Sequence, residues 1–216
     1  NIIEDCNRAA FIRSIIGDDV MLSMDANGVW SKKKAIENML ILKEYKPYWI
    51  EEPTHPDDIL AHKEIVEKIY PINVATGEQC SNKVMFKQFL QEKAITILQT
   101  DIQRLAGINE WLVVMLMCKK FGTKFCVHSG GVGLTNMGAH LSIINAICIN
   151  PRIKGCFAEY VEDLSEHFEH PVELINGNYF PPKVNGFGLE IKEKSIEEYK
   201  FPNGSYWKKN QDIIQD

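Results

Sequence analysis

Short β-rich runs alternate with amphipathic helical patterns along most of this chain, and each run ends near a polar residue. The runs are Val20–Met24, Tyr48–Ile50, Ile72–Thr76, Ala94–Gln99, Lys124–Val127 and Gly155–Ala158, and the helical patterns lie at 32–45, 57–69, 82–92, 108–121 and 133–147. Because strands that alternate with helices through short loops form parallel sheets, we expect an α/β protein. No glycine-rich nucleotide-binding motif follows the first run, which favours a (β/α) barrel over a doubly wound sheet.

The barrel is expected to be incomplete. Only six of the eight strands of a TIM-type barrel are present, after an opening helical pattern that Gly17 ends, and the chain does not begin with Met. We therefore predict a partial barrel domain over residues 1–164, with two strands and an amino-terminal capping domain upstream of residue 1. Residues 165–216 form a carboxyl-terminal extension of loops and short irregular elements that packs back on the barrel.

Six polar residues end these runs at intervals of 23 to 31 residues, which is about one βα unit. They are Asp25, Glu51, Glu78, Asp101, His128 and Glu159. The carboxyl ends of parallel barrel strands meet at one rim, where barrel enzymes carry their chemistry. A single acid after a strand more often caps the next helix or pairs with a lysine, but six such residues at one period predict an active site.

The types of these residues indicate the chemistry. Asp25, Glu51 and Glu78 form an oxygen-only, triply negative set, which favours Mg²⁺ over zinc. Asp101, one unit before His128, can hold the imidazole in one tautomer and raise its basicity. Glu159, the last of the six, can hydrogen-bond to charge that develops on a substrate.

The sequence motifs around these residues resemble those of the mandelate racemase subgroup of the enolase superfamily. The motifs are MDAN (24–27), WIEEPTHPDD (49–58), ATGEQCSNKVMFKQ (75–88), LQTDIQRLAGINE (98–110) and VHSGGVGL (127–134). Two further motifs, FAEYVEDLSEHF (157–168) and PPKVNGFG (181–188), resemble those of the L-fuconate dehydratase branch of that subgroup.

The resemblance implies Mg²⁺-dependent dehydration of an L-fuconate-like acid sugar to a 2-keto-3-deoxy sugar acid through an enediolate. It places the metal ligands on Asp25, Glu51 and Glu78, with Glu51 chosen over Glu52 because the family's ligand comes first in that pair. The His–Asp dyad falls on His128 and Asp101. The same resemblance makes Glu159 the acid that stabilises the enediolate.

One part of the family pattern is missing from this chain. The family carries a KxK motif on the preceding strand, whose second lysine faces the substrate opposite the histidine, and that strand would lie before residue 1. The fragment alone is therefore expected to be inactive, although the protein is predicted to be a hydro-lyase. Two alternatives stay open: a racemase or epimerase acting on a hydroxy acid at the same site, and a non-catalytic truncated isoform.

Composition excludes some partners. The net charge is −5 and the lysines and arginines are scattered, which argues against a nucleic-acid or membrane surface. No apolar run approaches the ~20 residues of a membrane span.

The six cysteines form no CxxC pair, so we expect reduced thiols in an intracellular, cytoplasmic or mitochondrial protein. A small-molecule acid sugar is the expected partner, with homo-oligomers at full length. Four histidines are predicted to lie at the surface: His55, His62, His167 and His170.

Overall fold

The computed structural model describes residues 1–130, 134–151, 155–161, 164–180 and 183–210. These residues form two compact units, one of residues 1–128 with 145–157 and the other of residues 129–144 with 158–216. The predicted domain boundary at residue 164 stays a prediction. The predicted loop at Pro181–Pro182 lies outside the described residues.

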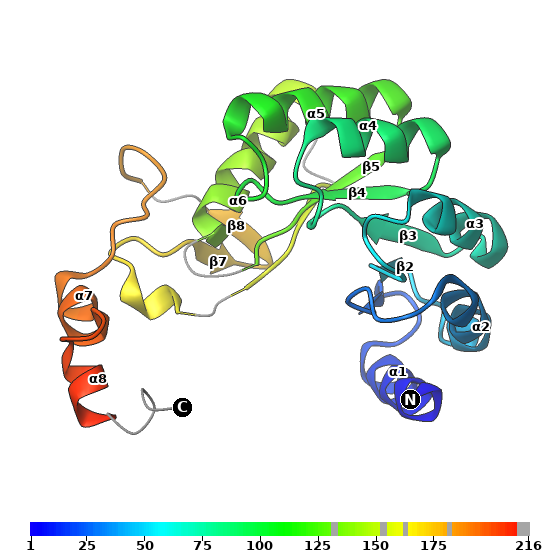
Figure 1. The fold of residues 1–216 in the computed structure, drawn as a ribbon, viewed down its shortest axis with the longest axis horizontal. Coiled ribbons are helices and arrows are strands. Elements are labelled where there is room, and N and C mark those ends of the chain that lie inside the picture. The colour runs from blue at the N-terminus through cyan, green and yellow to red at the C-terminus, as the bar shows by residue number, and fades with distance from the viewer. Residues whose placement is uncertain (131–133, 152–154, 162–163, 181–182, 211–216) are drawn as a thin grey trace. The chain divides into compact units, whose positions relative to one another are not determined.

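One curled sheet dominates the first unit. Its strands are β1 (Ser23–Asp25), β2 (Trp49–Glu51), β3 (Asn73–Thr76), β4 (Ile97–Thr100), β5 (Lys124–Val127) and β6 (Phe157–Ala158), in the order β1-β2-β3-β4-β5-β6. Each pairing from β1 to β5 is parallel. The sheet curls as part of a barrel does (Figure 1). The predicted incomplete (β/α) barrel is confirmed.

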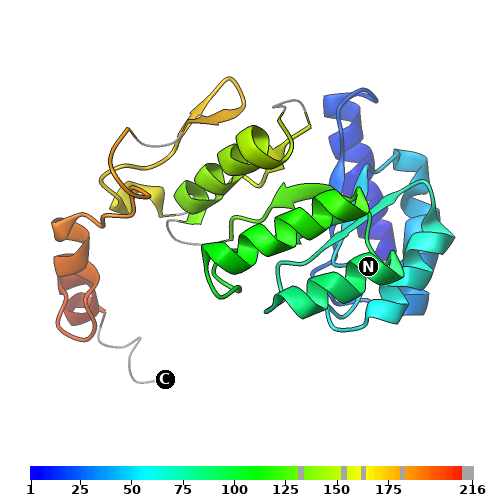
Figure 2. The same cartoon turned by 90° about the horizontal axis from the view of Figure 1, so that it is seen from above.

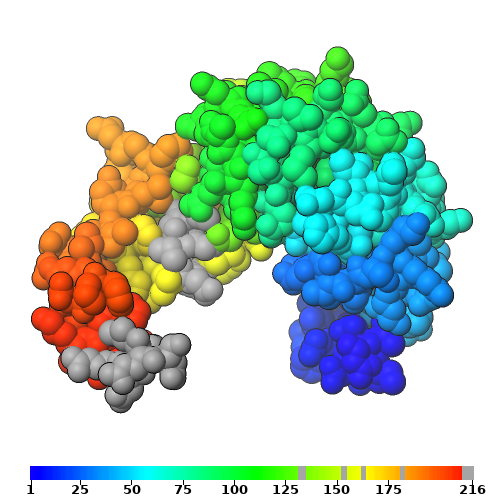
Figure 3. All heavy atoms as spheres, viewed as in Figure 1, coloured from blue at the N-terminus to red at the C-terminus, as the bar shows by residue number. Residues whose placement is uncertain are grey.

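Helices cover one face of this sheet (Figures 1 and 2). They are α1 (Ile2–Ile16), α2 (Lys32–Leu42) with the 3-10 turn η1 (Lys43–Tyr45), α3 (Ile59–Ile69), α4 (Lys83–Glu92) and α5 (Ile108–Phe121), and a π-helical turn η2 (Asn145–Ile149) precedes β6. Side-chain caps begin α2, α3 and α4 at Ser31, Asp58 and Asn82, and Gly122 ends α5 in the left-handed conformation. In the space-filling view these helices form the outer surface of the unit (Figure 3).

Two apolar layers lie on opposite faces of the sheet. The outer layer packs Ile50 and Val74 of the strands against helical residues such as Met39 and Ile65, all at most 1% exposed. The inner layer consists of buried Ala75, Ile97 and Cys126, with Trp49 and Phe157 packed against it. Side chains alternate along a strand, so the inner residues share the face of Glu51, Asp101 and His128. Met21, which precedes β1, lies outside both layers and is 48% exposed.

The second unit combines a helix with a hairpin and two short helices. Its elements are α6 (Leu134–Ile144), the 3-10 turn η3 (Ser165–His167), the antiparallel pair β7 (Glu173–Ile175) and β8 (Asn178–Phe180), α7 (Glu193–Tyr199) and α8 (Ser205–Lys209). Buried Asn136 of α6 donates from Nδ2 to the carbonyls of His170 (2.8 Å) and Gly188 (2.7 Å). In the described part of the chain, no helix is long and apolar enough to cross a membrane.

His62 is buried, and its predicted place at the surface is wrong. The side chain lies in the core between α3 and α4 and is fully inaccessible. Its Nδ1 contacts the carbonyl of Asp58 at 2.9 Å, and its ring packs edge-on against Phe89 at 5.3 Å. The Nε2 atom has no partner among the described residues. Burial lowers the pKa of His62, because the charged form would lose its hydration.

This burial predicts an acid sensitivity. Below about pH 6.5 the unfolded chain binds a proton at His62, whereas the buried side chain in the folded protein binds it less readily. The free energy of unfolding should therefore decrease as the pH is lowered. The loss should reach at most about 1.4 kcal/mol per pH unit. Urea unfolding of the complete natural protein between pH 7 and pH 5 measures it. His62→Phe should flatten this slope. Equal slopes in wild type and His62→Phe would contradict the prediction.

Candidate active site

The ends of five neighbouring strands carry five of the six predicted site residues. Asp25 ends β1 and lies in register with Glu51, which ends β2. Glu78 follows β3 by two residues, and Asp101 directly follows β4. His128 follows β5, and its backbone N–H extends the ladder to the carbonyl of Thr100 at 3.1 Å. The parallel sheet thus places these residues at one edge.

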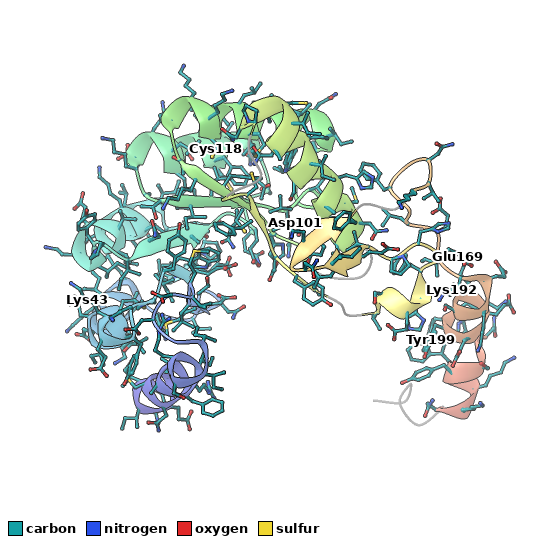
Figure 4. All side chains as sticks on the ribbon, turned by 180° about the vertical axis from the view of Figure 1, so that it is seen from behind. Lys43, Asp101, Cys118, Glu169, Lys192 and Tyr199 are labelled. Carbon is teal, nitrogen blue, oxygen red and sulfur yellow. The ribbon has the colours of Figure 1, made fainter. Side chains whose placement is uncertain are left out.

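His128 lies between two carboxylates. Its Nδ1 is 3.1 Å from Oδ2 of Asp101, which is the contact predicted for the dyad. Its Nε2 is 3.0 Å from Oε2 of Glu78, a contact that was not predicted. The three side chains are mostly buried, with exposures of 12% for His128, 5% for Asp101 and 16% for Glu78. Figure 4 shows Asp101 near the carboxyl ends of the strands, whereas Cys118 lies within the helical layer.

The imidazole of His128 stabilises the charged form of the Glu78 carboxylate. The hydrogen bond from His128 is the largest effect on the pKa of Glu78 and lowers it, against the opposing effect of burial. The other oxygen, Oε1, accepts a hydrogen bond from Nε2 of Gln79 at 2.9 Å. Both oxygens of this predicted ligand are therefore in use, and a cation at Glu78 would have to replace one of these contacts.

Local hydrogen bonds orient the other two predicted ligands. Oδ1 of Asp25 accepts from the backbone N–H of Asn27 at 2.7 Å, which folds the turn after β1. Oε2 of Glu51 accepts from Nε1 of Trp49 at 3.2 Å. Trp49 was missed as a site residue, but its position two residues before Glu51 on one strand indicated that both side chains share a face.

Glu52 is a further acidic residue of this region that the prediction set aside. It is 4% exposed, and its Oε1 has no hydrogen-bond partner among the described residues. Burial raises the pKa of Glu52 to about 7, and the charges of Glu78, Asp25 and Glu51 raise it too, whereas His128 lowers it. The three predicted ligands therefore lie close enough to Glu52 to repel its charge.

The donor set fits a hard divalent cation, although its side chains are not arranged around one. In the described part of the chain, no three carboxylate, imidazole or thiol groups converge where a metal ion could sit. Asp25, Glu51 and Glu78 nevertheless offer only oxygens, which Mg²⁺ prefers. The charges of these three residues all raise the pKa of buried Glu52, and a bound cation would offset that repulsion.

Glu159 belongs to the second unit. Its Oε2 accepts a hydrogen bond from the backbone N–H of Ser129, the residue after His128, at 3.0 Å. The hydroxyl of Tyr179 donates to its carbonyl at 2.7 Å, so the hairpin strand β8 helps to hold it. In the glycine-rich loop that follows His128, Gly131 and Gly133 lie outside the described residues.

The family model for Enolase C-terminal domain-like proteins matches residues 1–195. The chain belongs to this family.

Three relatives show which members of the family this chain is similar to. The crystal structure of human Mitochondrial enolase superfamily member 1 superposes with a TM-score of 0.93 at 45% identity, covering 97% of this chain and 48% of that one. L-galactonate dehydratase of Hypocrea jecorina is 45% identical over 96% of this chain and 47% of its own length. L-talarate/galactarate dehydratase from Salmonella typhimurium LT2, solved with Mg and L-lyxarohydroxamate, superposes with a TM-score of 0.77 at 27% identity over 90% of this chain and 46% of that one. The chain thus spans about half the length of these relatives, two of which are named as acid-sugar dehydratases.

Proposed function

We propose that this chain carries the active site of an Mg²⁺-dependent hydro-lyase that dehydrates an L-fuconate-like acid sugar. The observation that carries the proposal is the His128–Asp101 contact of 3.1 Å at the sheet edge that also bears Asp25, Glu51 and Glu78. The 45% identity to an L-galactonate dehydratase supports the substrate class. The magnesium in the Salmonella relative supports the metal.

The proposed reaction breaks the C2–H and C3–O bonds of the sugar acid, and the elements of water leave. The resulting enol becomes a 2-keto-3-deoxy sugar acid. Removal of a proton α to a carboxylate is difficult because it places a second negative charge on that group. When bound by Asp25, Glu51 and Glu78, Mg²⁺ would supply positive charge at the substrate carboxylate.

His128 is the proposed acid. Asp101 holds Nδ1 and stabilises the imidazolium, so Nε2 can deliver its proton to the departing C3 hydroxyl. Glu78 occupies Nε2 in this structure, and its turning toward a cation would free that nitrogen. Glu159 is proposed to hydrogen-bond to the charge that develops on the substrate.

A second base is needed for the C2 proton. The family pattern gives this role to a lysine on a strand before residue 1, so the 216 residues alone are proposed to be inactive. For another epimer of the substrate, the lysine and the histidine would exchange roles. The complete protein is proposed to act on a small molecule as a homo-oligomer, with no nucleic acid or membrane as partner. A mitochondrial location agrees with the name of the human relative.

Product analysis tests the proposal. The complete natural protein, incubated with L-fuconate or L-galactonate and Mg²⁺, should yield a 2-keto-3-deoxy acid detectable by NMR. Chelation of the metal should abolish turnover, and added Mg²⁺ should restore it. An epimerised acid formed without loss of water would show a racemase or epimerase instead. Absence of turnover on any acid sugar would favour the non-catalytic alternative.

A further inference from the structure

Glu52 has a buried carboxylate with an unused acceptor. The residue is 4% exposed, and its Oε1 has no hydrogen-bond partner in the described part of the chain. An acceptor that has left water without gaining a partner is unfavourable, and a charged one is more so. Such a group in a folded protein indicates a ligand, ion or water that supplies the missing contact.

The backbone holds Glu52 firmly in this position. Its φ of 39° lies in the left-handed region, which is uncommon for a residue with a side chain. Its N–H donates to the carbonyl of Ala75 at 3.0 Å, and its own carbonyl accepts from the N–H of Gly28 at 2.9 Å. These two bonds tie Glu52 to β3 and to the turn after β1. Strained backbone that neighbours on both sides hold in place is typical of functional sites.

The charges around Glu52 do not match a structural ion pair. Asp25 lies in register with Glu51, the residue directly before Glu52, so its neighbours at this strand end are acidic. The nearby positive candidate, His128, contacts Glu78 and Asp101. A buried carboxylate that stabilised the fold would be expected to face a lysine, an arginine or hydrogen-bond donors.

We infer that Glu52 is a fourth acidic residue of the cation site, whose unpaired Oε1 accepts a hydrogen bond from water on a divalent cation held by Asp25, Glu51 and Glu78. The inference rests on the proposed function. Mg²⁺ usually keeps several of its waters when a protein binds it, and those waters need acceptors. Partners beyond the direct ligands typically change metal affinity by about 10–100-fold.

The test measures metal binding directly. Isothermal titration of the complete natural protein with MgCl₂ alone, at about 0.15 M salt, should give Glu52→Gln an affinity about 10–100-fold below wild type. Glu52→Asp, which keeps the charge but shortens the reach, should also weaken binding. Exposed Glu67→Gln, which removes one negative charge from the outer helix α3, should leave the affinity unchanged. Without metal, Glu52→Gln should melt at the wild-type temperature or above it, because the buried Oε1 of Glu52 has no hydrogen-bond partner to lose among the described residues.

The outcomes separate this inference from the proposed function. If wild type binds no Mg²⁺, the proposed metal site is wrong. If wild type binds Mg²⁺ and Asp25→Asn weakens binding, but both Glu52 variants bind like wild type, only the role of Glu52 is overturned. A lower melting temperature of Glu52→Gln with unchanged Mg²⁺ affinity would likewise show that Glu52 serves the fold alone.

Discussion

Replacement of His128 with Asn is expected to slow dehydration by about 10²–10⁴-fold, which is the usual contribution of a general acid. Asn fills part of the space of the imidazole but cannot carry a proton to the leaving hydroxyl. The 3.0 Å contact between Nε2 of His128 and Glu78 would be lost as well. Because that contact competes with a cation for Glu78, Mg²⁺ affinity should stay the same or increase. Steady-state kinetics and MgCl₂ titration of the complete natural protein measure the two effects.

Two control variants sharpen this experiment. Asp101→Asn keeps the imidazole but removes the negative charge at Nδ1, so it should lower the turnover number without preventing metal binding. His55→Asn, in an exposed loop, should change neither quantity. If His128→Asn turned over acid sugars at the wild-type rate, the acid assignment would be wrong. If it lost Mg²⁺ binding, the histidine would belong to the metal site instead.

The repeated βα pattern predicted most of the first unit. The predicted helix at 108–121 has the bounds of α5, and the predicted strand at Lys124–Val127 has those of β5. The predicted start of the first strand at Val20 was wrong, because β1 begins at Ser23, where pairing with Trp49 begins. β-propensity marks residues that can form a strand, whereas the partner strand decides where the ladder starts.

The hairpin of the second unit was not predicted, although its signal was present. Asn176 and Gly177 both adopt positive φ, at 51° and 72°, and connect β7 to β8 as a two-residue turn. Asn-Gly between apolar residues is a strong hairpin signal. It was overlooked because the βα rhythm ends before it, which led to an expectation of loops and short irregular elements in this part.

For the site, sequence spacing predicted the positions of the residues along the strands but not the contacts between their side chains. The strand-end positions of Asp25, Glu51, Asp101 and His128 follow from the period of the sequence. The contact of His128 with Glu78 depends on how the loops after β3 and β5 pack, which spacing does not reveal. The burial of His62 likewise depends on Phe89, contributed by another helix. Sequence patterns thus predicted which strand ends carry these side chains, and packing decided which of them touch.

The loop between β3 and Glu78 depends on the absence of a side chain at Gly77. Gly77 has a φ of 136°, a conformation that residues with a Cβ rarely adopt. A Cβ built there would lie 2.0 Å from the backbone oxygen of Gln99 and 2.8 Å from Cε1 of Phe86. The oxygen belongs to β4, and the Phe86 ring is fully buried in the core, so neither can move away easily.

Gly77→Ala should therefore destabilise the protein by about 3–5 kcal/mol, adding backbone strain to overpacking. Gly122→Ala is the matched control, because Gly122 also has positive φ, at 69°, but has open space around its Cβ position. It should lose only about 1–2 kcal/mol, the strain of the left-handed conformation alone. Urea unfolding of the complete natural protein measures both.

Since Glu78 directly follows Gly77, any Gly77→Ala protein that still folds should also bind Mg²⁺ more weakly, whereas Gly122→Ala should bind it like wild type. Equal destabilisation by the two substitutions would show that the close approach of Gln99 and Phe86 is not what requires glycine at position 77.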